Sequence, residues 1–171
     1  VETPAQVAAL VAELRTVAGA ADAPVLIDQE GGRVQRLGPP HWPVYPPGAI
    51  FATLHDTDST LGLTAARLSA RLIAADLADL GITVDCLPLA DVPVSGADAV
   101  IGNRAYGTEP AKVAAIARAV TEGLEQGGVL PVLKGEESAV KDPNLKQVAT
   151  QLASATGYQL YLDQAYPPAV G

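Results

Sequence analysis

The stretch APVLIDQE, residues 23–30, decides the fold class of this chain. It is a short apolar run that ends in two carboxylates, without the polar and apolar alternation of a half-exposed strand. Such runs are typical of parallel strands that are buried on both faces of a sheet. ITVDCLPL at residues 82–89 and VLPVLK at residues 129–134 have the same character, so we expect three strands of this type.

Helical segments separate these runs along the chain. Apolar residues recur there every three or four positions, and a glycine ends each segment. We therefore expect four helices, over residues 3–19, 59–80, 108–127 and 142–157. Leu10 and Leu14 belong to the apolar stripe of the first helix. Leu61, Leu68 and Leu72 fall roughly on one face of the second.

The alternation of helices and strands predicts an α/β fold with a parallel sheet. A fourth strand is expected at residues 158–166, which makes the architecture either a partial (βα)8 barrel or an open parallel sheet of about four strands. The length suits a single α/β domain over residues 1–171. The bare edges of such a partial barrel invite pairing, so we expect either a homodimer through these edges or a flattened sheet.

Two long loops follow the first two predicted strands, whereas the turns from helix to strand are short. This asymmetry places the chemistry at the carboxyl ends of the strands, as in barrels and doubly wound sheets. Residues 31–47 contain five prolines, so we expect no regular structure in that loop.

Composition narrows the class of partner. Hydrophobic residues make up 49% of the chain, charged residues 18%, and the net charge is −8. A negative chain argues against nucleic acid or an anionic membrane surface, because both require a basic face. There is no apolar run long enough for a membrane span and no recognisable secretion leader. With Cys86 as the single cysteine and no Cys/His cluster, the sequence predicts neither a metal site nor a cofactor.

Charged side chains gather where the predicted strands end. Asp28 and Glu30 close the first strand, and Arg36 follows a Gly-Gly turn. Arg104 lies in the loop after the second strand, and Lys134 ends the third. Carboxylates and guanidiniums together suit a hydroxyl-rich ligand such as a sugar. The residues alone also allow internal ion pairs that shape the loops, or a lysine that marks where a strand meets water.

Four motifs together resemble the β-N-acetylhexosaminidases of glycoside hydrolase family 3, bacterial enzymes of peptidoglycan recycling: LIDQEGGRVQRL, LGITVDCLPLADVPV, AVIGNRAYGTEP and GGVLPVLK. The resemblance covers residues 1–134 and implies a (βα)8 barrel without its first part, and a cytoplasmic location. It also implies that an N-acetylglucosamine unit is bound by Asp28, Arg36, Arg104 and Lys134.

Beyond Lys134 the resemblance to this family ends. The family continues with a histidine, then a Pro-Gly-His-Gly loop that carries an Asp–His general acid/base, and later an aspartate nucleophile. None of these follows Lys134 in this sequence. Because retaining glycoside hydrolysis needs both a nucleophile and an acid/base, we predict no catalytic residue and an inactive fragment that retains its sugar-binding residues.

Residues 135–171 resemble a segment of the sugar-binding proteins of bacterial ABC importers, mainly through DPNLKQVA and QLYLDQAYPPAVG. This predicts a junction near 134/135 in a chimeric chain, either engineered or a natural fusion. Two alternative functions follow: a non-catalytic saccharide-binding module, or a chimeric scaffold that has no ligand.

Overall fold

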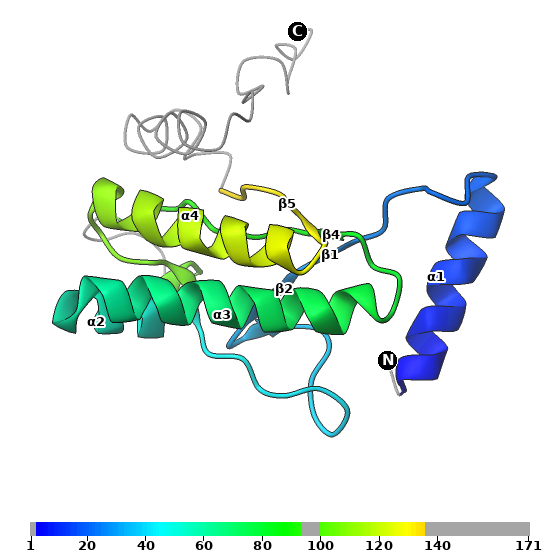
Figure 1. Ribbon diagram of the computed structural model, residues 1–171, viewed down its shortest axis with the longest axis horizontal. Helices are drawn as coiled ribbons and strands as arrows, with labels where there is room; N and C mark the ends of the chain where they lie inside the picture. The colour runs from blue at the N-terminus through cyan, green and yellow to red at the C-terminus, as the bar shows by residue number, and fades with distance from the viewer. Residues whose placement is uncertain (1–2, 94–99, 136–171) are drawn as a thin grey trace, which may run out of the picture.

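A computed structural model describes residues 3–93 and 100–135 of the chain (Figure 1). Its elements follow in the order α1 (Pro4–Ala18), β1 (Leu26–Ile27), β2 (Gln29–Gly31), β3 (Val34–Gln35), α2 (Gly48–Thr57), α3 (Ser59–Ala78), β4 (Val84–Asp85), the 3-10 helix η1 (Gly102–Arg104), α4 (Pro110–Gln126) and β5 (Leu130–Pro131). Helices α1, α3 and α4 confirm three of the predicted helices. The predicted fourth helix and fourth strand lie outside the described residues. No helix in the described part of the chain is long and apolar enough to cross a membrane.

The sheet is parallel, as predicted, with β4 between β1 and β5. Leu26 pairs with Val84, and Val84 pairs in turn with Leu130. A further parallel bridge joins Leu89 to Lys134, past the ends of β4 and β5. The α/β fold class is therefore confirmed. Because parallel strands end at the same edge, the residues that follow β1, β4 and β5 meet there.

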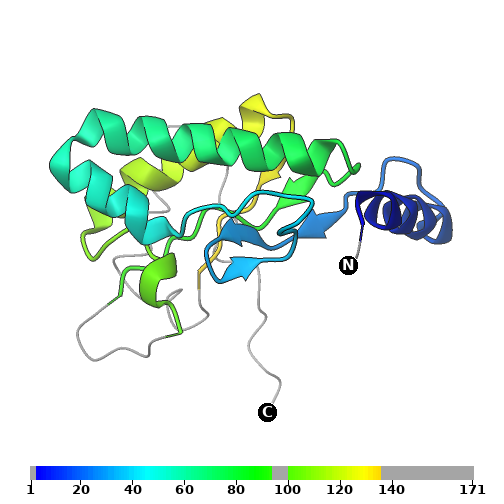
Figure 2. The ribbon, with the colours of Figure 1, turned by 90° about the horizontal axis from the view of Figure 1, so that it is seen from below.

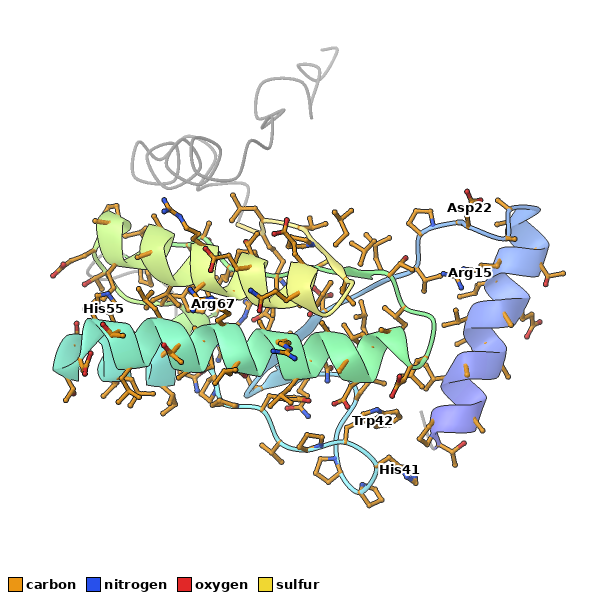
Figure 3. All side chains as sticks on the ribbon, in the orientation of Figure 1. Arg15, Asp22, His41, Trp42, His55 and Arg67 are labelled. Atoms are coloured by element: carbon orange, nitrogen blue, oxygen red, sulfur yellow. The ribbon has the colours of Figure 1, made fainter. Side chains whose placement is uncertain are left out.

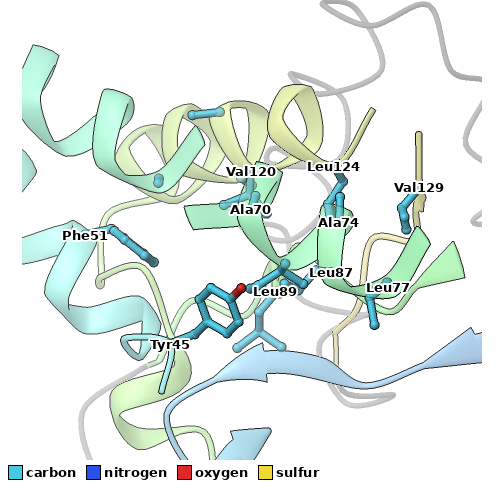
Figure 4. Packing of buried hydrophobic residues seen from close by; sticks show 14 of the residues in the cluster. Tyr45, Phe51, Ala70, Ala74, Leu77, Leu87, Leu89, Val120, Leu124 and Val129 are labelled. Atoms are coloured by element: carbon cyan, nitrogen blue, oxygen red, sulfur yellow. The ribbon is translucent and has the colours of Figure 1, made fainter. Parts of the chain in front are cut away.

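Helices α3 and α4 lie side by side and cover the sheet (Figures 1 and 2). Their contact is close because small residues line it. A Cβ atom on Gly123 would lie 2.2 Å from the Arg67 carbonyl oxygen, so no larger residue fits at that position. The core beneath the two helices includes Leu77, Leu87, Leu89, Val120 and Leu124 (Figure 4).

The leucine face of α3 is directed to solvent and not into this core. Leu61, Leu68 and Leu72 are 50, 52 and 60% exposed. The buried face carries small side chains instead, among them Ala66 and Ala70. The close approach of α4 selects these alanines, because leucines would hold the two helices further apart.

Helix α1 lies to one side of the body formed by the sheet, α3 and α4 (Figure 1). Val7 and Val11 are buried, but Leu10 and Leu14 are each 49% exposed, so only part of the predicted apolar stripe is covered. Arg15, in the last turn, donates hydrogen bonds to main-chain carbonyls in the connections that lead into β1 and β4 (Figure 3). Helix α1 is therefore attached partly through polar contacts.

The prediction that residues 31–47 lack regular structure is wrong at the start of that stretch. Strands β2 and β3 pair there as an antiparallel hairpin. The hairpin turns because Gly31 and Gly32 adopt φ angles of 88° and 56°, in the left-handed region that favours glycine. Helix α2, which follows the prolines, is not among the predicted helices. Its N-cap residue Pro47 makes no side-chain capping bond, so the usual sequence signal for a helix start is missing.

Candidate functional site

Charged side chains form one cluster at the carboxyl edge of the parallel sheet. Asp28 directly follows β1, Glu30 lies in β2, and Lys134 is bridged to the chain that continues from β4. The Lys134 ammonium donates to Asp28 Oδ1 at 2.7 Å and also pairs with the Glu30 carboxylate. Residues two apart in an extended chain share a face, so both acids meet the same lysine.

Arg104, the last residue of η1, completes the buried part of this cluster. Its Nε and Nη2 donate to the two carboxylate oxygens of Glu30, both at 2.8 Å, in the bidentate geometry of a strong arginine–carboxylate pair. The Glu30 side chain is only 5% exposed and that of Arg104 15%. Gly48 allows α2 to lie this close to η1, because a Cβ atom there would be 2.1 Å from the Arg104 carbonyl oxygen.

Arg36 and Asp28 form the exposed part of the cluster. Arg36 Nη2 lies 3.9 Å from Asp28 Oδ2, and the two side chains are 57% and 41% exposed. This distance is too long for a hydrogen bond, so the pair leaves the Arg36 donors available to solvent or to a ligand. The structure therefore brings all four predicted site residues together and adds Glu30 as a shared partner of Arg104 and Lys134.

The contacts with cations keep both carboxylates of the cluster ionised. The hydrogen bond from Lys134 is the main reason why the pKa of Asp28 lies below its ordinary value. Burial opposes the ionisation of Glu30, but the hydrogen bonds from Arg104 and Lys134 outweigh burial and lower its pKa. Carboxylates held in this way serve as hydrogen-bond acceptors and are poor general acids at neutral pH.

A second layer of polar residues lies beneath the cluster. Asp85 of β4 is completely buried, and its Oδ1 accepts a hydrogen bond from the Gln29 main-chain N–H at 3.0 Å. Its Oδ2 has no hydrogen-bond partner within residues 3–93 and 100–135. Burial raises the pKa of Asp85 to about 7. This carboxyl group titrates near neutral pH, unlike those of Asp28 and Glu30, but it does not reach the surface.

The arrangement suits a polar ligand that carries hydroxyl and amide groups. Three cations and two carboxylates converge, so each charge in the cluster has a partner of opposite sign. On the exposed side, Asp28 offers carboxylate oxygens and Arg36 offers N–H donors. Hydroxyl and amide groups can donate to the first and accept from the second. Glu30 was not among the four residues expected to bind the sugar, although the sequence places it at the end of the same strand. Its position two residues after Asp28 was the signal that the two acids share a face.

Comparison with known protein families decides the identity of the chain. The model of the glycosyl hydrolase family 3 N-terminal domain matches residues 1–138. The chain belongs to glycosyl hydrolase family 3. The matched region ends at residue 138. The junction predicted near 134/135 stays a prediction.

Individual members of glycosyl hydrolase family 3 are similar over the same region. The beta-hexosaminidase LpqI of Mycobacterium tuberculosis is 39% identical over 120 residues, which cover 69% of this chain and 29% of the relative. A beta-hexosaminidase of Methylococcus capsulatus is 36% identical over 132 residues, which cover 77% of this chain and 37% of the relative. The chain thus spans little more than a third, at most, of the length of these two curated relatives.

A solved structure agrees with this family 3 assignment. NagZ from Neisseria gonorrhoeae, in complex with N-trifluoroacetyl-D-glucosamine, aligns with a TM-score of 0.71 and 30% sequence identity. The alignment covers 80% of this chain and 40% of the NagZ chain. The fold described above is therefore that of part of a family 3 hydrolase.

Proposed function

We propose that this chain binds a saccharide of the N-acetylglucosamine type at the cluster formed by Asp28, Arg36, Arg104 and Lys134. The observation that carries the proposal is their convergence at one sheet edge, with Asp28 and Arg36 exposed to a ligand. The N-acetylglucosamine derivative in the NagZ complex supports the choice of sugar class.

Each residue has a distinct part in the proposed binding. The Asp28 carboxylate accepts hydrogen bonds from sugar hydroxyls, and the Arg36 guanidinium donates to hydroxyl or carbonyl oxygens. Lys134 holds Asp28 and Glu30 in place, which leaves one N–H donor of its ammonium group for the ligand. Arg104 uses Nε and Nη2 on Glu30, which leaves Nη1 for a ligand atom.

We further propose that the chain on its own binds the sugar without hydrolysing it. Cations hold both carboxylates of the cluster ionised. Neither Asp28 nor Glu30 is therefore suited to act as a general acid. Hydrolysis of a chromogenic N-acetylglucosaminide by the full chain, abolished by Asp28→Ala, would show that this proposal is wrong.

Other predictions about the whole chain stay predictions. These are the single domain over residues 1–171, the cytoplasmic location, the importer-like segment at 135–171 with its chimeric origin, and the homodimer through exposed strand edges. Light scattering tests the homodimer, and a compact monomer over a wide concentration range would remove it.

Calorimetric titration of the full chain with N-acetylglucosamine tests the binding proposal. We expect measurable heat below about 10 mM, a range that corresponds to only a few kcal/mol of binding free energy. Asp28→Asn and Arg36→Met should each weaken binding about tenfold. The matched exposed variants Asp22→Asn and Arg118→Met, away from the cluster, should leave the affinity unchanged. Absence of heat, or equal losses in all four variants, would contradict the proposal and favour a scaffold without a ligand.

A further inference from the structure

Gln29 is a buried polar residue between the two carboxylates of the cluster. It is 0% exposed, whereas its neighbours Asp28 and Glu30 both face Lys134. Successive side chains of an extended segment point to opposite faces, so Gln29 is directed away from Lys134 and into the protein. A buried side-chain amide is expected to have hydrogen-bond partners for both its oxygen and its nitrogen.

The Gln29 side-chain amide makes three hydrogen bonds to the main chain at Arg36 and Leu37. Its Oε1 accepts from the Arg36 N–H at 2.8 Å and from the Leu37 N–H at 3.0 Å. Its Nε2 donates to the Leu37 carbonyl oxygen at 2.9 Å. Strand β3 ends at Gln35, so these three bonds continue the hydrogen bonding of the hairpin where its ladder stops.

Gln29 is itself fixed from below by the central strand. Its main-chain N–H donates to the buried Asp85 carboxylate at 3.0 Å. A continuous path therefore runs from β4 through Asp85 and Gln29 to the main chain of Arg36. Breaking it would leave buried N–H groups unsatisfied, which is costly.

The Arg36 side chain depends on this support, because its own ion pair is weak. The pair with Asp28 is 3.9 Å long and half exposed, and such surface pairs contribute little to holding a side chain. The position of its main chain, which the Gln29 amide holds, therefore limits where the Arg36 guanidinium can lie.

We infer that Gln29 is a positioning residue: its buried amide places Arg36 beside Asp28 and so shapes the exposed half of the saccharide site. This inference rests on the proposed function for its effect on binding. Gln29 does not touch the ligand, and it acts only through Arg36.

A second glutamine in the same hairpin provides a matched control. Gln35 Nε2 donates to the carbonyl oxygens of Leu37 and Pro43, both at 2.7 Å, and its Oε1 accepts from the Tyr45 N–H at 2.9 Å. It therefore holds the outer part of the loop and makes no side-chain hydrogen bond to the N–H of Arg36.

Amide hydrogen exchange in the full chain tests the placement without any ligand. We expect Gln29→Met to reduce the protection of the Arg36 and Leu37 amides at least tenfold relative to the amides of α3 and α4. Gln35→Met should leave both amides protected. Unchanged protection in Gln29→Met would overturn the inference. If Gln29→Met does not fold, Gln29→Asn replaces it, because its amide is one methylene too short to reach both N–H groups. We expect the same loss of protection in Gln29→Asn, and retained protection would overturn the inference.

Sugar affinity tests whether Gln29 acts through Arg36. We expect Gln29→Met to weaken N-acetylglucosamine binding about as much as Arg36→Met, and the double variant to bind no more weakly than Arg36→Met alone. Multiplied losses in the double variant would show that Gln29 acts independently and would overturn the inference. If the unmodified chain binds no sugar, the proposed function fails, and hydrogen exchange alone decides whether Gln29 places Arg36.

Discussion

The two acid–arginine pairs of the cluster differ in burial and in geometry, although each joins a carboxylate to a guanidinium. Glu30 and Arg104 are nearly buried and form two short hydrogen bonds. Asp28 and Arg36 are half exposed and 3.9 Å apart. The buried pair joins η1 to the hairpin, whereas the exposed pair leaves hydrogen-bonding capacity for a ligand. Similar residues thus serve structure in one half of the site and, in the function that we propose, recognition in the other.

Removing the acid of the buried pair should have the largest effect. Glu30→Met leaves Arg104 and part of Lys134 without their carboxylate in a nearly buried place, so we expect a loss of about 3–5 kcal/mol in the free energy of unfolding. Urea denaturation measures this loss. The matched variant is Glu122→Met, which breaks the more exposed pair with Arg67 and should cost less than about 1 kcal/mol. Equal losses in the two variants would mean that the buried Glu30–Arg104 pair contributes no more to stability than an exposed pair.

Asp85, which is buried beneath the two pairs, should make the free energy of unfolding fall as the pH rises. The lowered pKa values of Asp28 and Glu30 act in the opposite direction. The Asp85 folded pKa of about 7 lies above the unfolded value, so its contribution to stability is fully present below about pH 4 and is lost as the pH rises through 7. Asp85→Asn keeps an acceptor for the Gln29 N–H and should gain at most about 4 kcal/mol over the parent chain at pH 8. Urea denaturation at pH 5 and pH 8 measures the difference; an equal effect at both values would mean that Asp85 does not titrate in this range.

Removing the exposed cation should have the smallest effect on stability. Arg36→Met breaks only a half-exposed pair, so we expect a change below about 0.5 kcal/mol in the free energy of unfolding, with the loss of sugar affinity described above. Thermal melting with and without N-acetylglucosamine separates the two effects. A large destabilisation without ligand would mean that Arg36 belongs to the structural half of the site.

Much of this fold could be predicted from local sequence signals. Three apolar runs give the strands of the sheet, and caps such as Thr3 and Gly19 mark the ends of α1. The face of α3 that is buried could not be predicted, because spacing groups the leucines but does not show which face α4 approaches. Helix α2 could not be predicted because it lacks a side-chain cap. The β2–β3 hairpin was missed because the prolines that follow it made the whole stretch look irregular.

The candidate site could be predicted as a set of residues but not as an arrangement. Asp28, Arg36, Arg104 and Lys134 stand at strand ends and loops, where parallel topology brings distant residues together. The roles of Glu30 and Gln29 depend on partners far along the chain or across the hairpin. No spacing rule in a single sequence reveals such partners.

The bond between Lys134 and Asp28 joins residues that are 106 positions apart in the chain. Contacts over such distances form late, because a long loop must close before they return any stabilisation. Helices α3 and α4 can form from nearby residues, but the cluster needs β1 and β5 in place on both sides of β4. The proposed sugar site would then form only when folding of the sheet is complete. Sugar binding during refolding would therefore report the last step of folding.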